Sequence, residues 1–150
     1  MKKIFVIATA LLMCCMFMGC GVKAQLVGTW KGSNTYGDSE EDSMYTLKID
    51  NTLNINKDGS YSWVTVRTET YTPTVGTPES DVVTYKQSGS WYYHDSDKVI
   101  LKITKNSYQV NDEEPEEHNE VGYGSAEVVL VDDILFVEYD GEIVEFTKSK

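Results

Sequence analysis

The chain has 150 residues, of which 41% are hydrophobic and 25% charged, and its 13 Lys and Arg against 24 Asp and Glu give a formal net charge of −11. This length is enough for one ordinary domain with its own core. The acidic balance argues against nucleic-acid binding, which needs a basic face, and against docking of the folded part on anionic lipid headgroups.

The N-terminus has the pattern of an export signal. A basic start, Met1-Lys2-Lys3, precedes an apolar run from Ile4 to Met18. That run is shorter than the roughly 20 residues that a membrane-spanning helix needs, but it suits the core of a signal peptide. We therefore expect residues 1–19 to be a signal peptide and exclude them from the fold.

Two cleavage sites follow the apolar run. The stretch "FMGC", Phe17 to Cys20, resembles a bacterial lipobox, in which the cysteine becomes the lipidated N-terminus, although Phe17 stands where that motif usually has an aliphatic residue. It predicts a lipid on Cys20, a tether over residues 20–26 and a cell-envelope protein, an outer-membrane lipoprotein. The alternative is ordinary cleavage after "VKA", Val22 to Ala24, which would release a soluble periplasmic or secreted protein beginning at Gln25.

The cysteines are confined to this N-terminal region. Cys14, Cys15 and Cys20 are the only three, so residues 21–150 contain none. The folded part can therefore form no disulfide of its own and offers no thiol as a nucleophile or metal ligand.

Alternation of apolar and polar residues, typical of strands, begins after the export signal. A first strand is predicted over Val27–Tyr36, and the clearest alternation follows in "YTLKIDNTLNIN", Tyr45 to Asn56. Its odd-numbered residues are apolar and its even-numbered residues polar, as in a strand with one face on a core. Asn51 alone breaks the apolar face, and predicts either a bulge or a position near the open end of a barrel.

An Asp-Gly turn joins this strand to the next. "KDG", Lys57 to Gly59, is a strong hairpin signal because glycine accepts positive φ without penalty. The next predicted strand is Ser60–Tyr71. Its inward face is predicted to carry the following residues: Tyr61, Trp63, Thr65, Arg67, Glu69 and Tyr71.

The rest of the chain continues the same pattern. Residues 72–80 are predicted as a loop, residues 95–97 as a turn, and the acidic segment 106–120 as a mobile loop or hairpin tip. The other predicted strands are 81–94, 98–104, 122–131, 134–139 and 142–147.

These eight strands predict an all-β domain over residues 27–150. Most connections are short, so strands that are neighbours in sequence are expected to pair. Closing into a single eight-stranded antiparallel up-and-down barrel removes both sheet edges. A two-sheet β-sandwich is the alternative.

Three short motifs carry a family resemblance. "GTW", Gly28 to Trp30, resembles the Gly-x-Trp start of lipocalins, and "NINKDGSYS", 54–62, with "GSWYY", 89–93, is similar to lipocalin-like domains of exported bacterial lipoproteins. The resemblance implies a lipocalin-like barrel in which Gly28, Trp30, Gly59 and Gly89 are structural. In lipocalins the first-strand Trp packs under an Arg of the last strand; here the nearest cation of the last strand is Lys148.

The residues give no reason to expect an enzyme. His94 and His118 are the only histidines, and neither accompanies a nucleophile motif or a metal-ligand spacing. No glycine-rich phosphate loop is present in the sequence. The acidic segments could offer carboxylates to Ca²⁺, but without the D-x-D-x-D-G spacing they read as solvated charge. We expect no catalytic residue, no metal and no cofactor.

Aromatic residues and one arginine are the candidates for ligand binding. Aromatic faces line apolar pockets, and a guanidinium fork suits carboxylates. The candidates are Tyr61, Trp63, Arg67, Tyr85 and Trp91. The sequence thus favours a membrane-tethered, non-enzymatic barrel for a small apolar or amphiphilic ligand. The alternative is an envelope accessory module with a filled barrel, whose loops contact a protein or a glycan.

The lipid anchor can be tested in the native host. Cys20→Ala should abolish lipidation, so the variant should stay uncleaved or be released in soluble form, whereas the wild-type chain should partition with membranes. Mass spectrometry of the mature N-terminus measures this directly. Recovery of an unmodified wild-type chain beginning at Gln25 would contradict it.

Overall fold

The computed structural model describes residues 24–40, 43–94, 98–118 and 125–149, and almost all of them are in β-strands. A single helical turn at 24–26 precedes the first strand. The strands are β1 (Gly28–Glu40), β2 (Ser43–Ile55), β3 (Ser60–Pro73), β4 (Glu79–Tyr93), β5 (Val99–Val110), β6 (Glu116–His118), β7 (Ser125–Val131), β8 (Ile134–Tyr139) and β9 (Glu142–Lys148).

Eight of these strands form a closed antiparallel barrel. The order is β4-β3-β2-β1-β9-β8-β7-β5, and β5 returns to pair with β4. The short strand β6 is an addition that pairs with the second half of β5. This arrangement confirms the predicted all-β up-and-down barrel and excludes the two-sheet sandwich.

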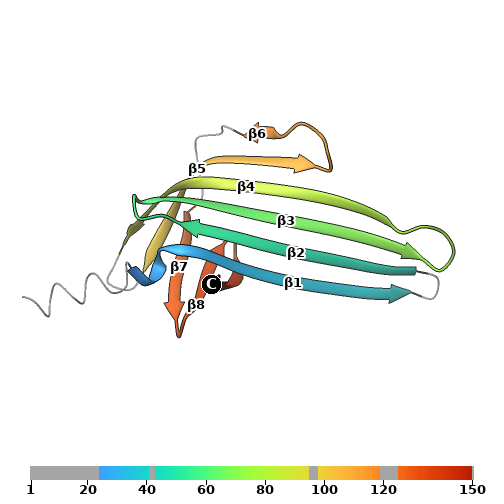
Figure 1. The fold of residues 1–150 in the computed structure, drawn as a ribbon, viewed down its shortest axis with the longest axis horizontal. Coiled ribbons are helices and arrows are strands. Elements are labelled where there is room, and N and C mark those ends of the chain that lie inside the picture. The colour runs from blue at the N-terminus through green and yellow to red at the C-terminus, as the bar shows by residue number, and fades with distance from the viewer. Residues whose placement is uncertain (1–23, 41–42, 95–97, 119–124, 150) are drawn as a thin grey trace, which may run out of the picture.

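The strands differ greatly in length. β1 to β4 have 13 to 15 residues each, whereas β7, β8 and β9 have 7, 6 and 7. Figure 1 shows the four long strands running side by side well beyond β7 and β8. β9 pairs with β1 only at Trp30 and Lys31. The barrel is therefore closed at one end, and at the other end the long strands continue as a curved sheet.

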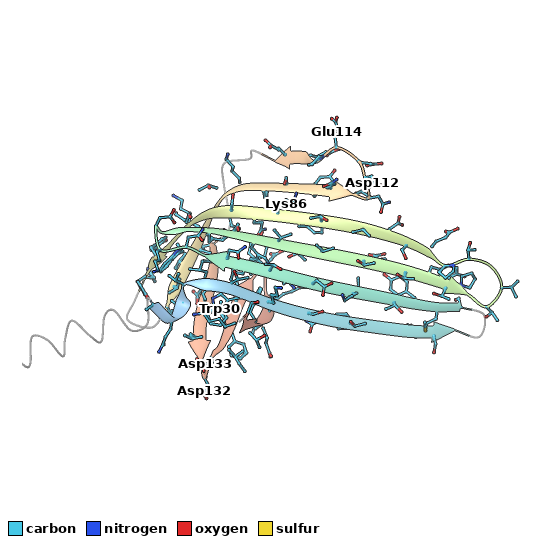
Figure 2. All side chains as sticks on the ribbon, viewed as in Figure 1. Trp30, Lys86, Asp112, Glu114, Asp132 and Asp133 are labelled. Carbon is cyan, nitrogen blue, oxygen red and sulfur yellow. The ribbon has the colours of Figure 1, made fainter. Side chains whose placement is uncertain are left out.

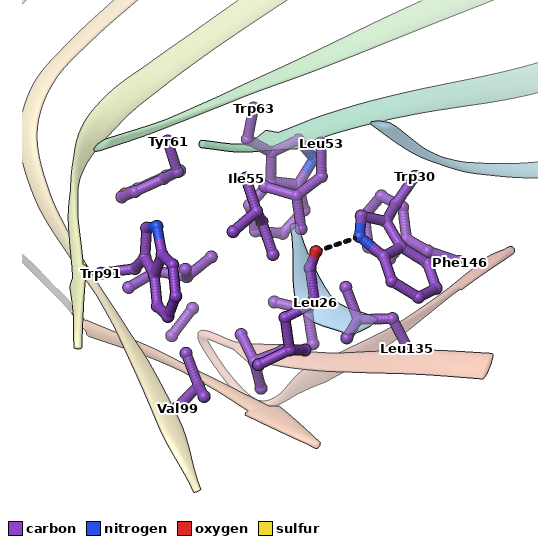
Figure 3. Packing of buried hydrophobic residues seen from close by; sticks show 14 of the residues in the cluster. Leu26, Trp30, Leu53, Ile55, Tyr61, Trp63, Trp91, Val99, Leu135 and Phe146 are labelled. Atoms are coloured by element: carbon purple, nitrogen blue, oxygen red, sulfur yellow. Dashed lines mark hydrogen bonds between the residues drawn. The ribbon is translucent and has the colours of Figure 1, made fainter. Parts of the chain in front are cut away.

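The hydrophobic core fills the closed end (Figure 3). Strand alternation explains its composition, because alternate residues of every strand point inward there. Its buried members are Leu26, Trp30, Leu53, Ile55, Tyr61, Trp63, Trp91, Val99, Leu101, Ile103, Ala126, Val128, Leu135, Val137 and Phe146.

Trp30 is buried at the closed end of the barrel, with only 1% of its surface exposed. Its indole N–H donates a hydrogen bond of 2.8 Å to the carbonyl oxygen of Leu26, in the helical turn before β1. The Lys148 Nζ lies 5.2 Å from the Trp30 ring centroid, within the range of a cation–π interaction. Lys148, the cation of the last strand nearest to Trp30, thus lies over its ring. Leu26, expected in the tether, belongs to the core.

The hairpin turns follow the sequence signals. Gly59 has a φ of +86°, and the Asp58 carboxylate accepts hydrogen bonds from the Ser60 N–H and hydroxyl at 2.9 and 2.7 Å. These bonds hold the pKa of Asp58 below its usual value. The turn before β9 has positive φ at Asp140 and Gly141. The β7–β8 turn at Asp132 and Asp133 (Figure 2) also has positive φ, which aspartate tolerates better than most residues.

Gly89 allows a close approach between β4 and β5. The strand register shifts between Ser88 and Gly89, and a Cβ at Gly89 would collide with the backbone carbonyl of Lys102. Gly28, with a φ of +143°, similarly faces the side chain of Lys148. A side chain at either position would therefore be strained.

Three segment predictions need correction. The segment 106–120 is not one loop, because residues 106–110 continue β5 and residues 116–118 form β6, with 111–115 as the connection between them; residues 119 and 120 lie outside the described residues. The predicted loop 72–80 is shorter, because β3 runs to Pro73 and β4 begins at Glu79. β1 runs four residues beyond its predicted end at Tyr36. The turn at 95–97, residues 122–124 of the predicted 122–131 strand, and Cys20 with the signal peptide lie outside the described residues.

Replacing Trp30 should destabilise the fold. Trp30→Ala removes a buried aromatic side chain and its hydrogen bond, and we expect a loss of about 3–5 kcal/mol in the free energy of unfolding. Denaturant titration followed by circular dichroism measures it. Tyr92→Ala, on the outer face and 47% exposed, is the control and should change stability by less than about 1 kcal/mol. Equal losses in the two variants would contradict the position of Trp30 in the core.

Candidate functional site

Two adjoining cavities lie on the inner face of the long strands, in the region where these strands extend beyond β7 to β9. Their volumes are about 380 and 970 Å³. They share four lining residues: Trp63, Thr65, Tyr85 and Tyr139. We call the continuous space the trough.

The floor of the trough is the surface of the core that faces the open end of the barrel. Trp63 is 5% exposed and packs edge-to-face against Tyr139 and Phe146, with ring centroids 6.0 and 5.7 Å apart. These contacts fix the indole ring between β3 and the β8–β9 hairpin. The floor is therefore a rigid aromatic surface.

Asn51 marks the boundary between core and trough. Its Oδ1 accepts hydrogen bonds from the Trp63 indole N–H at 3.1 Å and from the Thr65 hydroxyl at 2.7 Å. The register of β2 runs through Asn51 without a shift, so no bulge is present there. Asn51, the polar residue that breaks the apolar face, thus lies where the closed barrel opens. Of the two predictions for it, a bulge is wrong and a position near the open end is confirmed.

Tyrosines form much of the wall. Tyr36 and Tyr85 line the larger cavity from β1 and β4, and Tyr85 is 44% exposed. Tyr108 lines the smaller cavity and stands opposite Tyr85 in the β4–β5 register. The wall therefore presents flat, partly apolar surfaces to whatever enters the trough.

Arg67 also lines the trough, but its charge is already paired. Its Nη2 lies 2.7 Å from Glu69 Oε1, two residues along on the same face of β3. The side chains are 42% and 37% exposed, so the pair is not buried. Glu69, in contact with solvent, therefore neutralises Arg67 without any ligand.

The five predicted ligand-binding candidates divide between trough and core. Trp63, Arg67 and Tyr85 line the trough. Tyr61 and Trp91 are not among its lining residues, because they lie at the closed ends of their strands. Trp91 donates a hydrogen bond to the Asn56 carbonyl at 2.9 Å. The Tyr61 hydroxyl is buried and has no hydrogen-bond partner in the part of the chain that the structure describes, and this burial raises the pKa of Tyr61.

Sequence reasoning missed part of the trough lining. Asn106 and Tyr108 were placed in a loop because the segment that follows them is strongly acidic. Yet Tyr108 and Val110 alternate with polar neighbours, and the structure has residues 99–110 in β5. Reading this alternation up to Val110 would have extended the strand over both trough residues. Figure 2 shows Asp112 and Glu114 beyond the end of this strand.

The described part of the chain contains no group of three or more His, Cys, Asp or Glu side chains placed to hold a metal ion. Among the same residues, no helix is long and apolar enough to cross a membrane.

Comparison of the sequence with models of known protein families and with curated proteins finds no match to either.

Removing Arg67 should cost little stability. Because the ion pair with Glu69 is half-exposed, Arg67→Met should lower the free energy of unfolding by less than about 1 kcal/mol, as for other solvent-screened pairs. Denaturant unfolding at neutral pH measures this, and Lys48→Met, which removes the exposed outer-face pair with Asp50, is the matched control. A loss of several kcal/mol with Arg67→Met alone would mean that the pair is buried.

Proposed function

We propose that this protein is a non-enzymatic binding protein of the bacterial cell envelope, which holds a small amphiphilic or apolar molecule in the trough. The observation that carries the proposal is the unfilled inner face of the barrel. At the closed end side chains fill the interior, whereas at the open end they leave cavities of about 380 and 970 Å³. Pockets for small organic ligands have volumes of this order.

The lining supports an amphiphilic ligand. Leu47, Ile49 and Val144 contribute aliphatic surface, the tyrosines contribute aromatic surface with a polar tip, and Asn51 and Thr65 contribute polar groups. A mainly apolar surface with a few fixed polar groups is the usual composition of a ligand site. An accessory module with a filled barrel is less consistent with this interior.

The membrane tether belongs to the same proposal. A lipid on Cys20 would be separated from the helical turn at 24–26 by only a few residues, and the buried Leu26 would begin the fold. The binding domain would therefore stand close to the membrane surface. We further propose that the domain is lipocalin-like, on the motifs that contain Trp30, Gly59 and Gly89.

Binding can be tested with N-phenyl-1-naphthylamine, an uncharged probe that becomes fluorescent in apolar sites. The probe should bind the wild-type protein and lose about three- to tenfold in affinity with Tyr85→Ala, the usual value of an aromatic contact. Tyr92→Ala removes a similarly exposed tyrosine from the outer face of the same strand and should bind as the wild type does.

Two outcomes would contradict the proposal. One is the absence of any fluorescence increase with the wild-type protein. The other is an equal loss of affinity in the Tyr85 and Tyr92 variants, because the probe would then report surface adsorption rather than occupation of the trough.

A further inference from the structure

The trough has one cationic lining residue among the described residues, and that residue is neutralised. Arg67 is the only arginine in the chain, and Glu69 pairs with it at 2.7 Å. Strand alternation places the neighbouring Lys48 and Lys86 on the outer face, where Lys48 pairs with Asp50 at 2.7 Å. An anionic headgroup entering the trough would find no free positive charge there.

The rim of the trough is acidic. Asp140 and Glu142, at the β8–β9 turn, line the larger cavity. They lie well within a Debye length of a ligand in that cavity, which is about 8 Å at physiological salt, so their repulsion of an anion is only partly screened. The net charge of −11 acts in the same direction. The electrostatics therefore disfavour a fatty-acid-like carboxylate.

Two polar atoms at the trough are buried and have no partner within the described residues. They are an acceptor, Asn106 Oδ1, and a donor, Arg67 Nε. Asn106 lines the smaller cavity and Arg67 the larger one. An unpaired buried polar atom costs free energy that a ligand group can recover.

These two atoms, one acceptor and one donor, determine which polar groups a ligand needs. A carboxylate only accepts hydrogen bonds, so it could not serve the Asn106 oxygen, and a quaternary ammonium group could serve neither atom. A hydroxyl both donates and accepts, so hydroxyl groups could serve both sites. Gln87 and Thr65, in the same lining, extend this uncharged hydrogen-bonding surface.

The tyrosines add a requirement for flat apolar surface. Tyr36 and Tyr85 are both more than two-fifths exposed, and Tyr108 stands opposite Tyr85. Aromatic rings pack well against a flat C–H surface. A pyranose ring combines such a face with hydroxyl groups around its edge.

From these observations we propose that the trough recognises an uncharged sugar ring, whose apolar face lies on the tyrosines and whose hydroxyls reach Asn106 and Arg67. This inference rests on the proposed function and names the ligand class of the same site. The ring could belong to a free oligosaccharide or to the headgroup of a neutral glycolipid.

The test compares three amphiphiles that share an octyl chain and differ only in the head: octyl β-glucoside, octanoate and octyltrimethylammonium. Each is titrated below its micelle concentration as a competitor of N-phenyl-1-naphthylamine on the full-length protein, and maltotetraose is tested as a sugar without a chain. We expect the glucoside to bind at least about tenfold more tightly than the other two, with little dependence on salt.

The site is then checked with Asn106→Leu. This variant should weaken glucoside binding several-fold, and it should still bind N-phenyl-1-naphthylamine because the aromatic lining of the trough is retained. Binding of maltotetraose would identify the free sugar as sufficient. Binding of the glucoside alone would identify a glycolipid headgroup. Both results support the proposal.

The results that would contradict the sugar proposal can be distinguished from those that would contradict the proposed function. Tighter binding of octanoate or octyltrimethylammonium, or equal binding of all three amphiphiles, would overturn the sugar proposal while leaving an amphiphile-binding trough. Equal glucoside binding by the Asn106 variant and the wild type would also overturn it. If the wild-type protein binds neither the fluorescent probe nor any amphiphile, the proposed function itself fails.

Discussion

The difference in strand length between the two halves of the barrel determines the rest of the structure. A barrel closes only over the length at which every neighbouring pair of strands can hydrogen-bond. β7, β8 and β9, with at most 7 residues each, close the barrel around one end of strands nearly twice as long. The inner face of the long strands has no opposite wall beyond that point. The trough is a direct consequence of this mismatch.

The boundary between the packed core and the trough requires side chains that are compatible with an apolar and a polar environment. Trp63 supplies a large apolar ring to the core, but its indole N–H must find a partner when buried. Asn51 provides that partner and also accepts from Thr65, whose side chain lines the trough. A short polar layer therefore separates the dry core from the open space. The same layer orients Trp63, on which the floor of the trough depends.

The sequence predicted the barrel well because apolar–polar alternation is a local property, which can be recognised in each strand separately. The inward face of β3 followed from the spacing of its residues and the turn at Gly59 from the Asp-Gly pair, whereas the role expected of Trp30 came with the resemblance of its motif. The extent of the trough could not be predicted in this way. It depends on how far one strand extends beyond another strand that is distant in sequence. The pairing of Arg67 was equally inaccessible, since both a buried and an exposed pair with Glu69 fit the same spacing. Asn106 and Tyr108 were missed because the acidic residues after Val110 outweighed a weak alternation before it.

An open sheet with inward tyrosines and an unpaired edge carries a risk of aggregation, and the residues of β1 reduce it. Within the described residues β2 pairs with β1 along its whole length, but β9 pairs with it only at Trp30 and Lys31, so beyond Lys31 the edge of β1 away from β2 offers free backbone groups. That edge segment, "GSNTYGDSE", is polar and contains two glycines and two acidic residues, and it lacks the apolar run that strand addition favours. The net charge of −11 adds general repulsion between copies. The acidity of the chain thus has two physical effects: it opposes association of an incompletely closed barrel with other copies, and it makes the potential at the trough unfavourable for anions.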